Sequence, residues 1–129
     1  MSDKVDYYIG VDSDQWFELK DNRPDLAEKI ATSALKQVGE TLYKAVEDIL
    51  DARKDNKIPD YFGQAVIWGI KENGSGLARN ENYEKLVPEN VRKMVDEAEQ
   101  KVRDGKFKVP TAYGMSQEDV DAIKNSVKP

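Results

Sequence analysis

Apolar residues along the chain fall into continuous runs and into helical stripes. Two runs, Val5 to Val11 and residues 62–70, are rich in β-branched and aromatic residues and predict buried strands. Lys106 to Pro110 alternates polar and apolar residues and predicts a short edge strand, where a closing proline is tolerated. Residues 29–33 are a further candidate for a short extended segment. Together these stretches predict a small, mostly parallel sheet.

Three stretches have the apolar spacing of amphipathic helices. Residues 34–53 repeat apolar side chains at steps of three and four. A second helix is expected over residues 89–103, opened by Pro88 and ended by Gly105. The third runs from Ser116 to about residue 127, with Ser116 in a capping arrangement. Strands that alternate with helices indicate an α/β fold, with the sheet flanked by helices.

The predicted elements are joined by polar connections. Residues 17–25 and 54–60 each contain a proline among charged side chains and are expected to be loops. The Gly74-Ser75-Gly76 stretch has two glycines of a phosphate-binding loop, but it lacks a third glycine and a strong helix directly after it. A tight turn that uses positive φ at a glycine is the favoured interpretation.

Composition sets the class of protein and excludes some partners. The chain has 129 residues, enough for one domain or part of one, with 35% charged and 39% hydrophobic residues, as soluble globular chains have. Its net charge is −5, and the 20 basic residues are interleaved with 25 acidic ones. Because phosphate binding requires a clustered basic face, nucleic acid is not an expected partner.

The absence of cysteine and histidine narrows the chemistry further. It removes disulfides, thiol nucleophiles, imidazole bases and the common zinc sites. Neither a cofactor nor a metal is expected. The chain has no apolar run of about 18 residues. The N-terminal residues MSDKVD lack the charged segment followed by an apolar segment that is typical of a signal peptide. As given, the chain is expected to be soluble and not self-exporting, with its compartment unknown.

A polar cluster at the end of the first predicted strand is the candidate site. Asp12 follows the apolar run, and Lys36 is placed in the first turn of the next long helix. Strand carboxyl ends and helix N-termini commonly meet where α/β proteins bind ligands, and a carboxylate with an ammonium suits a sugar. The alternative is that Asp12 caps a turn and Lys36 is a solvated charge. Asp14 and Gln15 are expected to support the loop rather than to contact a ligand.

Two tryptophans are also candidates for ligand contact. Trp16, beside the polar cluster, and Trp68, inside the second predicted strand, have rings that can stack on a base. For Trp68, a place in the core is the favoured interpretation.

Four blocks of the sequence resemble the C-terminal part of the basic membrane protein (BMP) family, the nucleoside-binding lipoproteins of ABC transporters. The blocks are IGVDSDQ, IATSALKQVGETLYKAVEDIL, AVIWGIKENGSGLA and LVPENVRKMVDEAEQKVRDGKFKVPTA. They cover about residues 5 to 112, so the chain divides into a solute-binding portion, 1–112, and a helical tail, 113–129.

The resemblance implies part of a type I periplasmic-binding-protein fold, without the region that precedes the VDSDQ strand. It also implies that Asp12 contacts ribose hydroxyls of a nucleoside and that Lys36 reaches into the same cleft. An ABC transporter permease is the implied partner. Members of this family are extracytoplasmic and anchored to the membrane.

These observations support a non-enzymatic solute-binding module. The alternative is a structural or oligomerising fragment that retains no ligand. A hydrolase that uses Asp12 and Asp14 is disfavoured, because no base or metal ligands accompany them. A small sheet with open edges also predicts a homo-oligomer, and exchange of elements between copies is one way to form it.

Overall fold

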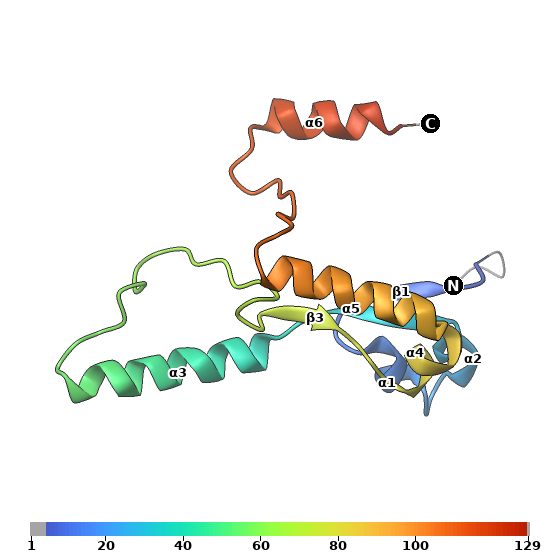
Figure 1. The fold of residues 1–129 in the computed structure, drawn as a ribbon, viewed down its shortest axis with the longest axis horizontal. Coiled ribbons are helices and arrows are strands. Elements are labelled where there is room, and N and C mark those ends of the chain that lie inside the picture. The colour runs from blue at the N-terminus through green and yellow to red at the C-terminus, as the bar shows by residue number, and fades with distance from the viewer. Residues whose placement is uncertain (1–4, 129) are drawn as a thin grey trace.

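A short three-stranded sheet is the centre of the structure, a computed structural model that describes residues 5–128 (Figure 1). Residues 1–4, which begin the MSDKVD stretch, and residue 129 lie outside the described part. In chain order the elements are β1 (Tyr8–Asp12), α1 (Gln15–Leu19), α2 (Pro24–Ala27), β2 (Ile30–Lys36), α3 (Val38–Lys54), β3 (Ser75–Leu77), α4 (Glu81–Leu86), α5 (Glu89–Arg103) and α6 (Gln117–Ser126).

The sheet has the order β1-β2-β3. β1 and β2 are parallel, and their register ends at Asp12 opposite Leu35. β2 and β3 are antiparallel, with Lys36 opposite Ser75. The α/β class and the small sheet flanked by helices are therefore confirmed, and the short third strand makes the sheet mixed.

The predicted helix over residues 34–53 starts later than expected. The chain remains extended as β2 up to Lys36, and α3 begins at Val38. Pairing with β1 and β3 on both sides supplies ladder hydrogen bonds that outweigh the local helical pattern of these few residues. Lys36 is thus at the end of a strand, and its predicted place in a first helical turn is wrong.

The strands predicted at 62–70 and 106–110 are absent from the part of the chain that the structure describes. Residues 62–70 form turns and coil, and Ile67 is 69% exposed. A strand needs a neighbour for its N–H and C=O groups, and in this fold β2 pairs instead with β1 and Ser75–Leu77. The expected turn is present at residues 70–74 and ends where β3 begins, but its positive φ, 56°, belongs to Asn73 and not to a glycine.

The expected loop at 17–25 also differs from the structure. It contains most of α1 and the start of α2. Asp14 accepts a hydrogen bond from the Phe17 N–H at the N-terminus of α1, and Pro24 occupies the first turn of α2. Local capping stabilises these short helices where the hydrophobic pattern is too brief to indicate them.

The buried core lies where α1, α2 and α4 pack on one side of the sheet. Its fully or nearly fully buried apolar residues are Ala27, Ile30, Ala78 and Tyr83. Three buried polar side chains accompany them, and each makes a hydrogen bond to an element distant in sequence. These are Thr32, Ser33 and Asn82. Helix α4 was not predicted, although Asn80 at its N-cap followed by two glutamates in the first turn is a recognisable start signal.

The two C-terminal helices are confirmed at almost the predicted bounds. Pro88 precedes α5, and Gly105 with φ 70° follows its end. The Ser116 hydroxyl accepts a hydrogen bond from the Asp119 N–H at the start of α6. Start and stop signals of this kind act within one turn, so they can be identified in the sequence.

Helix α5 is held beside the sheet by an ionic cluster. The Glu99 carboxylate accepts hydrogen bonds from Arg103 (2.9 Å) and Arg79 (2.9 Å), and Arg79 also pairs with Asp96. Arg103 further donates to the Ile70 carbonyl oxygen at 2.6 Å. The two guanidinium groups, with Arg103 the larger influence, lower the pKa of Glu99 below its usual value.

We expect the free energy of unfolding of Glu99→Gln to depend less on pH in the acid range than that of the unmodified chain. A carboxyl whose pKa is lowered by folding stabilises the fold above its unfolded pKa of about 4.3, and that contribution is lost as pH falls through the folded pKa. Urea unfolding at neutral and acidic pH measures this. The variant should lose about 1 kcal/mol at pH 7 and less or nothing in acid. Glu97→Gln, on the same helix, is the control, and equal losses in both variants would contradict the assignment.

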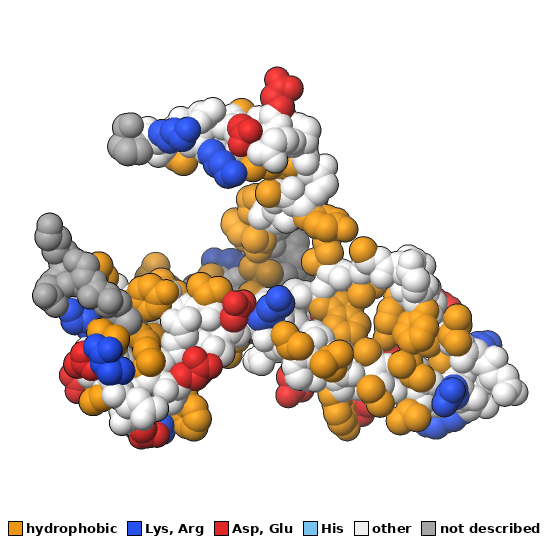
Figure 2. Space-filling model, turned by 180° about the vertical axis from the view of Figure 1, so that it is seen from behind, with side chains coloured by type: hydrophobic (Ala, Val, Ile, Leu, Met, Phe, Trp, Pro, Cys, Tyr) orange, Lys and Arg blue, Asp and Glu red, His pale blue; other side chains and the backbone are white. Residues whose placement is uncertain are grey.

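Much apolar surface is exposed. The chain has a solvent-accessible area of 10181 Å², whereas a compact monomer of its 14.6 kDa mass has about 6,900 Å². Helices α3 and α6 project from the sheet (Figure 1), and hydrophobic side chains are spread over the arm formed by α3 and the following loop (Figure 2). The chain alone therefore leaves roughly 3,300 Å² more surface in water than a compact fold of its size.

Candidate functional site

Asp12 is in a strained turn at the carboxyl end of β1. Its φ is 71°, and the Ser13 N–H donates to the Val11 carbonyl oxygen at 3.0 Å, which closes a three-residue turn around Asp12. Such turns with positive φ are rare and strained, although aspartate tolerates them better than most residues. Strain of this kind is concentrated at ligand-binding positions. The side chain is exposed at the end of the sheet.

Lys36 is at the same end of the sheet, on the neighbouring strand. Asp12 is opposite Leu35 in the parallel register, and Lys36 is the next residue of β2. Asp12 and Lys36 are therefore both at this end of the sheet, through two strand ends instead of the predicted strand end and helix. Both side chains are exposed, and among the described residues neither group makes a side-chain hydrogen bond or a salt bridge.

The loop after Asp12 is fixed by hydrogen bonds. Both carboxylate oxygens of Asp14 accept from the Asn80 side chain, at 2.8 and 3.0 Å, and Asp14 also caps α1. The Gln15 N–H donates to the buried Ser33 hydroxyl at 3.2 Å. Asn80 in turn caps α4 by accepting from the Tyr83 N–H. Asp14 and Gln15 thus support the loop, and Asp12 is left free of such bonds.

The two tryptophans contact residues away from the ends of β1 and β2. Trp16 is half-buried in α1, and the Lys20 ammonium lies 5.2 Å from its ring centre. Trp68 is half-buried and packs edge-on against Tyr61, with ring centres 6.0 Å apart. Trp68 is therefore in a small aromatic cluster of the loop after α3, and its predicted place in a core strand is wrong.

The arrangement suits recognition of hydroxyl groups. A carboxylate accepts hydrogen bonds from two hydroxyls, and an ammonium donates up to three. In residues 5–128 no group of three or more acidic side chains is placed to hold a metal ion, and no helix is long and apolar enough to span a membrane. The ends of β1 and β2 therefore offer a negatively charged carboxylate and a positively charged ammonium for polar contacts.

Comparisons with known proteins found one similar fold and one similar sequence. No family model matches the chain. A solved structure of an ABC transporter solute-binding protein from Aeropyrum pernix K1 superposes on 93% of this chain with a TM-score of 0.57, at 22% sequence identity. Similarity at this identity shows a shared fold, that of part of a periplasmic solute-binding protein.

One curated protein is similar in sequence. The CD4+ T-cell-stimulating antigen of Listeria monocytogenes serovar 1/2a is 32% identical over 106 residues, which are 81% of this chain. The chain spans 27% of the length of that antigen and 36% of the Aeropyrum protein. It corresponds to about a third or less of either relative.

Proposed function

We propose that the chain is a solute-binding module of the BMP type, the C-terminal portion of a protein that delivers a nucleoside to an ABC transporter permease. In this proposal Asp12 accepts hydrogen bonds from ribose hydroxyls and Lys36 donates to the same solute. The strained turn at Asp12 is the observation that supports it most, because it presents a free carboxylate beside Lys36 at the end of two parallel strands.

The role is binding and not catalysis. The sheet edge carries one carboxylate and one ammonium, without the nucleophile and oriented base that hydrolysis requires. The described residues form a single small sheet, so a solute at its edge is covered on one side. We therefore expect weak affinity, with a dissociation constant of about 1 mM or above.

Calorimetric titration with adenosine, guanosine and inosine tests the proposal, and Asp12→Gly is the informative variant. Glycine keeps the positive φ and removes the carboxylate. Binding should weaken about tenfold or more, because a charged hydrogen-bond acceptor is lost. The free energy of unfolding should stay within about 1 kcal/mol of the original.

Asp21→Gly is the matched control, since Asp21 is exposed in the connection between α1 and α2. It should leave nucleoside affinity unchanged. Nucleoside binding that is unaffected by Asp12→Gly would remove Asp12 from the site. If the unmodified chain shows no binding at nucleoside concentrations well above the expected dissociation constant, solute recognition by this chain is refuted.

A second candidate function is an oligomerising module without a retained ligand. The surface excess of roughly 3,300 Å² is the specific observation that favours it. A homo-oligomer is compatible with both candidates. They are distinguished by whether nucleoside evolves heat on binding to the oligomer.

A further inference from the structure

Helix α3 has an apolar stripe that none of residues 5–128 covers. The loop after it packs on one side, where the Tyr61 hydroxyl donates to Asp48 at 3.0 Å. On another side the apolar residues recur at steps of three and four and are 51–65% exposed: Val38, Leu42, Tyr43, Val46 and Leu50. A helix of 17 residues is marginal in water without packing. The stripe therefore needs a surface to cover it.

The connection to β2 prevents α3 from covering its own sheet. Only Gln37 separates β2 from α3, and its N–H donates to the Gly74 carbonyl oxygen at 3.0 Å. A helix that returns over the preceding strand needs a loop of a few residues, because the chain must reverse. Here α3 continues away from the sheet, as Figure 1 shows.

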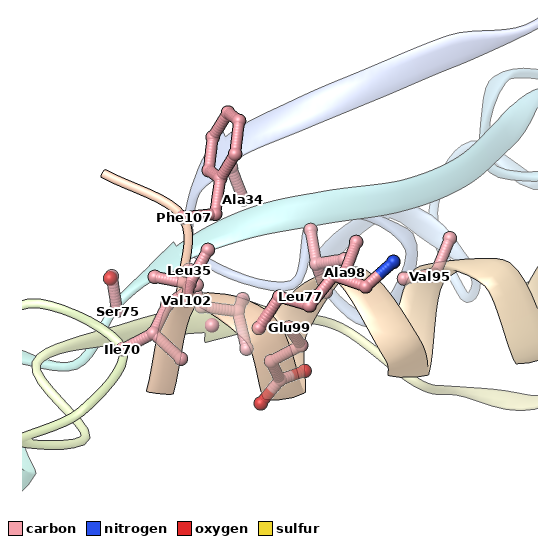
Figure 3. A pocket seen from close by; sticks show the side chains of 12 residues that line it. Ala34, Leu35, Ile70, Ser75, Leu77, Val95, Ala98, Glu99, Val102 and Phe107 are labelled. Atoms are coloured by element: carbon pink, nitrogen blue, oxygen red, sulfur yellow. The ribbon is translucent and has the colours of Figure 1, made fainter. Parts of the chain in front are cut away.

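The same chain has an uncovered sheet face. Gly10 is buried on the α1 side, so alternation along β1 directs Ile9 and Val11 to the opposite face, where they are 62% and 55% exposed. Beside them, an apolar cavity of about 510 Å³ lies between the sheet and α5 (Figure 3). Its lining includes Ala34 from β2, Leu77 from β3, and Val95, Ala98 and Val102 from α5. Ala34 is opposite Val11 in the strand register, so the cavity adjoins the exposed face of β1, and we call the two surfaces together the groove.

We propose that two copies of this chain exchange α3, so that the stripe of each copy lies in the groove of the other, over β1 and beside α5. The chain carries both complementary surfaces, and a two-fold arrangement satisfies both of them and then closes. The surface excess of roughly 3,300 Å² per chain exceeds the about 800 Å² per partner that a standard interface buries. The excess is therefore more than enough to supply a stable dimer interface, and a standard interface would cover about a quarter of it.

This inference is independent of the proposed solute, and its test contains none. Light scattering after size-exclusion chromatography, over a roughly hundredfold range of protein concentration, should show a dimer that dissociates on dilution. Leu42→Lys and Val46→Lys should each raise the dimer dissociation constant about tenfold or more, because a charge enters an apolar contact. Both positions are exposed in the single chain, so circular dichroism of the dilute variants should be unchanged.

Glu40→Lys is the matched control, since it also adds a lysine to α3 but lies outside the stripe. It should leave dimerisation unchanged. A monomer at all concentrations, or a dimer insensitive to both stripe substitutions, would overturn the proposal.

Disulfide trapping locates the contact. Because the chain has no cysteine, Val11→Cys and Val46→Cys each introduce a single thiol. When the two variants are mixed and oxidised, we expect a disulfide between unlike chains, from β1 of one to α3 of the other. Predominant linkage of two Val46→Cys chains would instead show helix paired with helix, and would refute the exchange.

Discussion

Gly10→Ala is expected to destabilise the fold by about 2–4 kcal/mol, measured by urea unfolding. A Cβ at this position would overlap the Ser33 hydroxyl and lie 3.0 Å from Oε1 of Gln15. Ser33 is fully buried, and its Oγ accepts the Gln15 N–H, so the hydroxyl cannot turn away without loss of that bond. The glycine is needed because strand β1 and the start of α1 approach closely here.

Two further variants separate this clash from a general effect of alanine. Gly39→Ala, in α3, adds a Cβ that meets nothing within 4 Å, and should stabilise the chain by up to about 1 kcal/mol. Ser33→Ala removes the atom that the new methyl group strikes, so the double variant with Gly10→Ala should be more stable than the sum of the single changes predicts. Strict additivity would show that the overlap is relieved by another movement.

Asn82→Ala is expected to cost about 2–4 kcal/mol in the free energy of unfolding. Asn82 is 3% exposed, and its amide donates to the carbonyl oxygens of Ile30 at 2.7 Å and Ala27 at 3.2 Å. These carbonyl groups lie where α2 passes into β2, so Asn82 ties α4 to the central strand. Its removal leaves buried acceptors unpaired, which costs more than the mean value of a hydrogen bond.

The isosteric Asn82→Asp sharpens this prediction. The amide has an NH₂ group that donates to carbonyl oxygens, whereas a carboxylate of the same shape would face them without a donor. Asn82→Asp should therefore be at least as destabilising as Asn82→Ala at neutral pH. Asn90→Ala, at an exposed position in α5, is the control and should change stability by less than about 1 kcal/mol. Similar values for Asn82→Ala and Asn90→Ala would show that the buried amide contributes little.

The position of Asp12 at the end of a strand was predicted correctly, whereas the element that carries Lys36 was not. The polar cluster after an apolar run indicated Asp12 as a residue at the end of a strand, and the structure has it there. Lys36 was expected on a helix, and its nearness to Asp12 comes from the register of two parallel strands. Register depends on which strand pairs with which, and the spacing of residues along one chain does not contain that information.

The hydrogen bonds of the loop in VDSDQ (residues 11–15) could not be predicted from the sequence pattern either. Asp14 and Asn80 are 66 residues apart, and each has an ordinary capping role in its own helix. Their mutual hydrogen bonds exist because β1, β2 and β3 bring the starts of α1 and α4 together. Short helices of four to six residues have too few apolar positions for a periodic signal, so α1, α2 and α4 were missed.

The sequence by itself determined the elements whose signals are local: β1, the body of α3, and α5 and α6 with their caps. The predicted burial of β1 is wrong, because Gly10 is its one buried residue. Capping side chains, proline and glycine act within a turn, and an amphipathic stripe repeats over several turns, so these elements need no knowledge of neighbours. Only the tertiary structure decided that residues 30–36 form the central strand, that residues 62–70 form none, and that the described residues leave the stripe of α3 uncovered. Each of these depends on which surfaces meet, because a strand or an apolar face is stabilised only by the partner that pairs with it.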